Sequence, residues 1–152
     1  MTVVTDAMRA QIGLETAPYS MPVESGDLIR FASMIEAGEP WLVSQETARA
    51  SRYGGLVAAP TYLIVMRQLE TRALAKLDIR IPYSNGVDGG SDWEYFEPIR
   101  SGDTVTATAR LADYQEHLTK FGQSLFQIFE IVYRNQYGHV VMRQRDTRIF
   151  YP

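Results

Sequence analysis

The chain has no cysteine, no long apolar run and no basic segment, and each absence excludes a class of protein. Without cysteine there is no disulfide framework, no thiolate nucleophile and no thiolate metal site. The longest apolar run, residues 62–66, is far shorter than the ~20 residues that a membrane-spanning helix needs. No basic stretch leads into an apolar one at the N-terminus, so no signal peptide is expected. The expected location is therefore the cytoplasm, away from any membrane.

Positive charge is limited and is carried almost entirely by arginine. The net charge is −3, and Lys76 and Lys120 are the only lysines. Because there is no Lys/Arg stripe, nucleic acid is not expected as the main partner. Arginine can hold phosphate through two parallel hydrogen bonds, so a phosphate-bearing ligand such as coenzyme A is compatible with this composition. The two histidines, His117 and His139, lie far apart in the sequence, and we expect neither a metal site nor a bound cofactor.

What is present is an ordinary globular composition, in which 45% of the 152 residues are hydrophobic and 22% are charged. A chain of this length is expected to form a single domain over residues 1–152. Residues 1–16 show little periodicity and are expected to form a loose N-terminal arm.

The first half of the chain is predicted to be mainly helical. Ser25 is placed to cap a helix that closes near Gly38, within which apolar residues recur at helical spacing. Ser44 is placed to cap a short helix that ends near Ser51.

The longest helix is predicted to open at Pro60 and Thr61 and to run to about Leu77. Its first turns, residues 62–66, are apolar on every side, so other structure is expected to surround this end. The later turns are amphipathic, and Glu70 falls in the half that is expected to face water.

The second half of the chain is predicted to form an antiparallel sheet, which makes the fold class α+β. Apolar and polar residues alternate after a turn at residues 101–103, and Asn135–Gly138 supplies a later turn. Asn85-Gly86 marks the loop before the sheet. Pro18 and Pro22 confine an earlier strand to a sheet edge, since proline has no N–H to donate. The expected strands cover about residues 17–23, 90–97, 103–116, 122–135 and 139–150.

The strand expected at residues 122–135 is apolar on both faces. Leu125 and Phe129 point to one side, while Phe126 and Val132 point to the other. One helix cannot cover both faces of a sheet. We therefore expect a partner subunit behind the sheet, and hence a dimer or a higher oligomer. The alternative is that the N-terminal segments fold over the second face.

Three segments stand out by their order and spacing: residues 52–62, Arg-Tyr-Gly-Gly-Leu-Val-Ala-Ala-Pro-Thr-Tyr, then Gly89 to Asp103, and then Asn135 to Val141. With these segments the chain resembles the MaoC-like acyl-thioester dehydratases and hydratases over nearly its whole length. The resemblance implies the hot-dog fold, in which a curved antiparallel sheet wraps around one long central helix. Members of that family add water to, or remove it from, acyl chains that are thioester-linked to coenzyme A or acyl carrier protein.

The chain departs from this family at the residues that move protons. Active members position and deprotonate water with a loop of the form Asp-x-Asn-Pro-x-His. The matching loop here has Ala37 at the Asp position and Leu42 at the His position. Active members also hold the thioester oxygen with a glycine N–H at the start of the central helix. Here that place reads Ala58-Ala59-Pro60, and Pro60 has no N–H to donate.

The resemblance therefore implies one unit of a divided enzyme, with no catalytic residue of its own. Several MaoC-like enzymes split their work between two hot-dog units, of which one carries the Asp/His loop. The other often begins its helix with Pro-Thr, as at Pro60-Thr61, and shapes the acyl tunnel. We expect a homodimer or higher oligomer, or a heteromer with a catalytic MaoC-like subunit. The residues expected to contact the substrate are Gly38, Glu39, Pro40, Ala59, Pro60, Thr61, Asp88, Gly89, Gly90, Ser91 and Trp93.

Other interpretations of these residues stay open. The glycine pair at 89 and 90 also fits a bulge that begins a strand. Glu70 resembles the helix carboxylates of hot-dog thioesterases, and Asp88 or Glu39 could be a relocated base, so an acyl-CoA thioesterase is one alternative function. A non-catalytic acyl-thioester binding or assembly protein is another.

Overall fold

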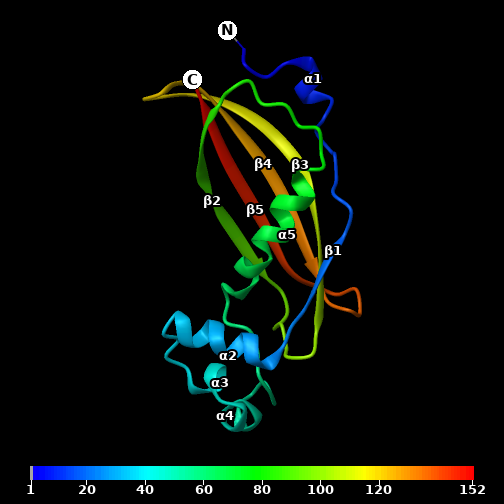
Figure 1. Cartoon of the computed structure of the whole chain (residues 1–152), viewed down its shortest axis with the longest axis vertical. Helices are drawn as coiled ribbons and strands as arrows, with labels where there is room; N and C mark the ends of the chain where they lie inside the picture. Colours follow the sequence, from blue (N-terminus) through cyan, green and yellow to red (C-terminus); the bar gives the residue numbers. More distant parts are fainter. Residues whose placement is uncertain (1) are drawn as a thin grey trace.

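A five-stranded antiparallel sheet, curled around one helical segment, dominates the computed structural model, which describes residues 2–152 (Figure 1). The strands follow the spatial order β1-β3-β4-β5-β2, so β1 and β2 are the two edges. Their bounds are β1 Tyr19–Pro22, β2 Asn85–Tyr95, β3 Thr104–Thr119, β4 Gly122–Arg134 and β5 Val140–Tyr151. The prediction of an antiparallel sheet with a proline-containing edge strand is confirmed.

The helices are short, and half of those in residues 2–152 gather at one end of the sheet (Figure 1). They are α1 Asp6–Arg9, α2 Ser25–Met34, α3 Pro40–Val43, α4 Gln45–Ala50, the 3₁₀ helix η1 Tyr62–Met66 and α5 Arg67–Leu74. Only η1 and α5 lie along the sheet. No helix within residues 2–152 combines the length and the apolar character that crossing a membrane requires.

The prediction of one long helix opening at Pro60 is wrong in its first turns. Pro60 lies in a turn, and residues 62–66 form η1 rather than α-helix. Tyr62 N–H donates to the carbonyl of Ala59, which is the tighter bond of a 3₁₀ turn. The β-branched side chains of Ile64 and Val65 lower helix propensity at this point. The α-helical part begins only at Arg67.

Of three further predicted boundaries, one agrees with the structure and two differ from it. Ser25 is the first residue of α2 instead of its cap, because its hydroxyl bonds that of Ser101, at 2.6 Å. Ser44 does cap α4, with its side chain accepting from the Thr47 amide. The strand β2 begins five residues earlier than predicted, so Asn85-Gly86 pairs with β5 and is not a loop.

The core lies between the inner, concave face of the sheet and the segment formed by η1 and α5. Phe129, Ile131 and Tyr133 of β4 are 1% exposed or less on this face, and Met66 from η1 is fully buried against it. Phe31 of α2 meets Tyr62 edge-to-face, with ring centroids 5.5 Å apart, and so joins the helical end of the molecule to η1.

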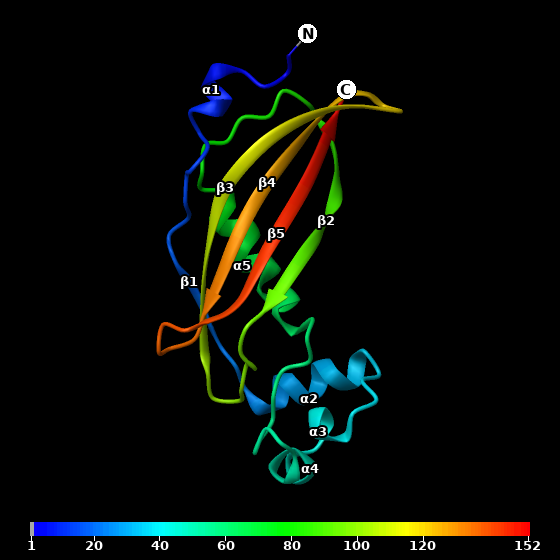
Figure 2. The same cartoon turned by 180° about the vertical axis from the view of Figure 1, so that it is seen from behind.

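The outer, convex face of the sheet has no other part of residues 2–152 lying over it (Figure 2). The N-terminal residues run along the edge of β3 instead: the Gly13 and Thr16 amides donate to the carbonyls of Leu111 and Ala109. On β4 the outward side chains of Phe126 and Val132 are half-buried. The chain's own N-terminal segment therefore does not cover the second apolar face.

Candidate functional site

In the loop that corresponds to the family's Asp/His loop, the two positions of the acid and the base pack against the core. Ala37 is half-buried, and its amide donates to the Ala32 carbonyl at 2.9 Å. The chain turns away from α2 just before it, at Glu36, which has the left-handed conformation with φ 51°. Leu42 in α3 is 7% exposed and belongs to the core. Both positions therefore hold apolar side chains that stabilise the helical end by burial and cannot transfer a proton.

An apolar hollow of about 390 Å³ lies beside Pro60. The residues that line it are Tyr53, Val57, Ala58, Ala59, Pro60, Tyr95, Phe96, Glu97, Pro98 and Ile99. It brings two of the predicted substrate contacts, Ala59 and Pro60, against the end of β2. Thr61 is exposed and does not belong to the lining. We call this space the proximal hollow.

The glycine pair forms a bulge in β2, between Asp88 and Gly90. Gly90 has φ +108°, a conformation that side chains rarely adopt. A Cβ on Gly89 would come within 2.9 Å of the side chains of Thr147 and Ile149 in β5. The bulge and the close approach of β5 account for both glycines, which is the second of the two interpretations given for them.

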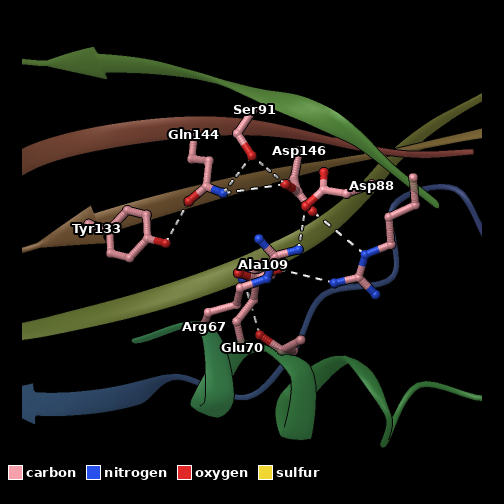
Figure 3. A network of polar contacts seen from close by, with 10 residues as sticks. Arg67, Glu70, Asp88, Ser91, Ala109, Tyr133, Gln144 and Asp146 are labelled. Carbon is pink, nitrogen blue, oxygen red and sulfur yellow. Dashed lines mark hydrogen bonds and ion pairs between the residues drawn. The ribbon is translucent and has the colours of Figure 1, made fainter. Parts of the chain in front are cut away.

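The structure places Glu70 in the interior, so the prediction that it faces water is wrong. Its exposed fraction is 3%, and it follows Met66 and precedes Leu74 at four-residue spacing on the buried stripe of the helical segment. Its Oε1 lies 3.3 Å from Nη2 of Arg148, and Nε of that arginine lies 3.6 Å from Oδ2 of Asp146 (Figure 3). Arg148 on β5 is thus the cation between two carboxylates, Glu70 on α5 and Asp146 on its own strand.

Hydrogen bonds extend this ion pair across the inner face of the sheet. Ser91 Oγ donates to Oδ1 of Asp146 at 2.6 Å, and the amide of Gln144 donates to both of them at 3.4 and 3.5 Å. The hydroxyl of Tyr133 donates to Oε1 of Gln144 at 2.8 Å. We call the set formed by Glu70, Ser91, Tyr133, Gln144, Asp146 and Arg148 the buried polar network. Figure 3 shows it spanning from α5 to β2 and β4.

A second, more exposed ion pair lies next to this network. Arg67 at the start of α5 donates to Oδ2 of Asp88 at 2.6 Å, and Asp88 also accepts from the Gly90 amide at 3.0 Å. These two hydrogen bonds hold the pKa of Asp88 below its ordinary value. Asp88 thus links the bulge of β2 to the start of α5.

Burial raises the pKa of Glu70 above its ordinary value, and repulsion from Asp146 raises it further, while Arg148 opposes the shift. The folded chain therefore binds this proton more tightly than the unfolded chain. The contribution of Glu70 to stability is complete below pH 4.5 and is lost as the pH rises through the raised pKa.

Replacing Glu70 with glutamine is expected to change the stability of the chain in a pH-dependent way. Glutamine keeps the shape and an oxygen that accepts from Arg148, but it carries no buried charge. The free energy of unfolding of Glu70→Gln relative to wild type should therefore increase from pH 4 to pH 8, measured by urea denaturation at a series of pH values. A difference that is constant, or that decreases with pH, would contradict the buried-carboxylate interpretation.

The remaining predicted site residues lie apart from these two places. Gly38, Glu39 and Pro40 are exposed at the start of α3 and line neither the proximal hollow nor the network. Trp93 lies between them on β2, with its ring 6.3 Å from that of Tyr95. Among residues 2–152, no three His, Cys, Asp or Glu side chains are grouped so that they could hold a metal ion.

An antiparallel sheet curled around one helical segment defines the hot-dog fold. Residues 10–144 match the model of the FAS1-like dehydratase domain region, and the chain belongs to this family. A UPF0336 protein of Clavibacter michiganensis subsp. michiganensis is 31% identical to it over 106 residues, which cover 69% of this chain and 70% of that protein.

Two solved structures have the same fold. One is a C-terminally truncated HadBC (3R-hydroxyacyl-ACP dehydratase) complex from Mycobacterium tuberculosis, which superposes with a TM-score of 0.76 at 20% identity, over 91% of this chain and 96% of that one. The other is a MaoC-like dehydratase from Rhodospirillum rubrum, with a TM-score of 0.68 at 20% identity and 92% coverage of each chain. The predicted α+β hot-dog fold is therefore confirmed.

Proposed function

We propose that this chain is the substrate-binding subunit of an enoyl-thioester hydratase or 3-hydroxyacyl-thioester dehydratase, and that a catalytic hot-dog partner supplies the Asp/His pair. One observation carries the proposal. An apolar hollow lies beside Pro60, at the start of the central helical segment, while the positions that match the family's acid and base hold Ala37 and the buried Leu42.

The chemistry of hydration explains why a partner is required. Negative charge grows on the thioester oxygen in the transition state, and a preorganised N–H donor must stabilise it. Water must also lose a proton to a base. Pro60 has no N–H, and neither Ala37 nor Leu42 can accept a proton, so the proposal assigns both functions to a second subunit.

The carrier proposed for the acyl group is coenzyme A or acyl carrier protein, with no further cofactor. The acyl end would lie against Ala59, Pro60 and Tyr95 in the proximal hollow. Contacts from Gly38, Glu39, Pro40, Thr61, Asp88, Gly89, Gly90, Ser91 and Trp93 remain predictions.

The exposed edge strand β2 is the proposed interface with the partner subunit. It ends the sheet, so one side of its backbone is free to pair with another strand. The ion pair between Arg67 and Asp88 fixes the start of α5 beside this edge, next to the exposed apolar side chains of η1. Apolar side chains are exposed on η1 and along β2 up to the residue that follows it: Ile64, Val65, Val87, Tyr95 and Phe96. A partner with the same fold could bury this strip, as a second copy of the chain or as a catalytic unit, and the HadBC dehydratase is itself a complex of this kind.

The test is to purify the chain alone and with candidate hot-dog subunits that carry an Asp-x-Asn-Pro-x-His loop, and to measure hydration of crotonyl-CoA. The chain alone is expected to show no turnover above buffer. A stable complex with one such subunit is expected to hydrate the substrate, and a proximal-hollow variant, Ala59→Trp, is expected to remove this activity while leaving the complex intact. Ordinary turnover by the lone chain would refute the proposal.

The thioesterase alternative has one favouring observation, which is the buried carboxylate of Glu70 with its raised pKa. It predicts hydrolysis of acyl-CoA by the lone chain and loss of that hydrolysis in Glu70→Gln or Asp88→Asn. A non-catalytic binding or assembly protein would instead bind acyl-CoA saturably and stay inactive with every hot-dog subunit added.

A further inference from the structure

We infer that the buried polar network closes the groove between α5 and the sheet, so that this unit buries only the first part of an acyl chain. The inference rests on the proposed function, because it takes the proximal hollow as the place where the acyl group enters. It concerns a specificity determinant, formed by Glu70 on the helix and by Gln144, Asp146 and Arg148 on β5.

Two apolar hollows lie at opposite ends of the groove. The first is the proximal hollow beside Pro60. The second, which we call the distal hollow, has a volume of about 310 Å³ and lies beside the C-terminal half of α5. The residues that line the distal hollow are Thr71, Leu74, Ala75, Leu77, Ile79, Ile81, Gln127, Phe129, Arg148 and Phe150. A continuous channel between the two would accommodate a long alkyl chain.

The pairing of β2 with β5 shows what lies between the hollows. Tyr95 pairs with Met142 at the proximal end, and Gly86 pairs with Phe150 at the distal end. The inward-facing pairs between these ends involve, in order along β5, Gln144, Asp146 and Arg148. All three side chains belong to the buried polar network, so the middle of the groove is polar while both of its ends are apolar.

The network also crosses the groove from one wall to the other. Glu70 reaches from α5 to Arg148 on β5 at 3.3 Å, so an ion pair crosses the space between helix and sheet at this point. Glu70 and Asp146 are 3% and 2% exposed, and Tyr133 is 1% exposed. An alkyl chain that passed here would separate buried opposite charges and break the hydrogen bonds of Gln144 and Ser91, without supplying any polar partner in return.

The position of the network limits the length of acyl chain that can be buried. Gln144, the first polar member, lies two residues beyond Met142, which is about 7 Å along the strand. While a chain is being buried, each added methylene is expected to tighten binding roughly fourfold. Once its end reaches Gln144, further methylenes must turn back into water and should add nothing.

The experiment is isothermal titration of the purified chain, alone and in complex with its catalytic subunit where one is found, with butyryl-, octanoyl- and dodecanoyl-CoA. Affinity is expected to rise from butyryl- to octanoyl-CoA and to stay within about twofold from octanoyl- to dodecanoyl-CoA. A continued rise of tenfold or more in the last step would overturn the inference and leave the proposed function standing. Failure of all three ligands to bind would instead remove both.

A double variant tests whether the network is the cause. Glu70→Ala with Arg148→Ala removes the ion pair that crosses the groove, while Asp146 keeps its hydrogen bonds from Ser91 and Gln144. It should bind dodecanoyl-CoA at least tenfold more tightly than octanoyl-CoA. The matched control is Glu130→Ala with Arg110→Ala, which removes an ion pair of the same two residue types from an exposed position. The control should keep the wild-type profile. A folded double variant, checked by circular dichroism, that also keeps the wild-type profile would contradict the assignment, and if it does not fold, the wild-type series alone decides.

Discussion

Arg148→Met is expected to lower the free energy of unfolding by about 3 kcal/mol, near the bottom of the range for breaking a buried ion pair. The arginine is the cation that faces both Glu70 and Asp146, and without it two carboxylates that are 3% and 2% exposed are left facing each other. Methionine retains most of the packing against Phe129, over whose ring the guanidinium lies at 5.1 Å. Because the arginine side chain is itself 28% exposed, a loss at the upper end of the range is not expected.

Equilibrium unfolding in urea at pH 7 measures this effect. The matched control is Arg110→Met, which breaks the Arg110–Glu130 pair on the outer face, where the two side chains are 50% and 42% exposed. An exposed pair contributes up to about 1 kcal/mol, so this variant should unfold close to wild type. At pH 4 the loss caused by Arg148→Met should become smaller, since protonation of Glu70 removes part of the repulsion. Equal losses for the two arginine variants at pH 7 would show that Arg148 is not a structural cation.

Val65→Glu is expected to weaken subunit association at least about 100-fold, because burying an unpaired carboxylate costs several kcal/mol. Val65 is 41% exposed on η1, and its neighbour Ile64 is 39% exposed, although both belong to a run of five apolar residues. Tyr62, Leu63 and Met66 of the same run face the core. The prediction that other structure surrounds this end on every side therefore fails within the chain, and a partner subunit would supply the missing cover.

Sedimentation velocity over a concentration series, with and without the catalytic subunit, measures association. Leu118→Glu is the control, since Leu118 is an apolar side chain that is 82% exposed near the end of β3, at the opposite end of the sheet from η1. That variant should associate as wild type does. If Val65→Glu also leaves association unchanged, the interface does not include η1. The outer face of the sheet, with Phe126 and Val132 half-buried, would then be the next candidate.

How well the sequence predicted each element depended on how local the signal was. Alternation of apolar and polar residues placed β3, and the turns beside them placed β4 and β5, all to within three residues at each end, since both signals lie within short segments. Ser44 was identified as a cap because its hydroxyl serves an amide three residues away. The length of β2 was underestimated, because Asn85-Gly86 has the composition of a turn and forms a strand only through its pairing with β5.

The buried polar network was missed for a related reason. Residues 143–148 read Arg-Gln-Arg-Asp-Thr-Arg, an unbroken polar run in which nothing local distinguishes the inward side chains from the outward ones. A signal for Glu70 did exist, because four-residue spacing aligns it with Met66 and Leu74. A glutamate on that stripe becomes plausible only when a cation is available across the groove, and Arg148 lies 78 positions further along the chain.

Patterns and residue types within short segments were enough to predict the antiparallel sheet, the family and the lack of an acid and a base at the matching loop. The burial of Glu70, its ion pair with Arg148 and the exposure of Ile64 and Val65 became apparent only from the folded chain. Each of these features depends on which side chains a distant segment places against it and on how much water is thereby excluded. No single segment of the chain encodes either of these two conditions.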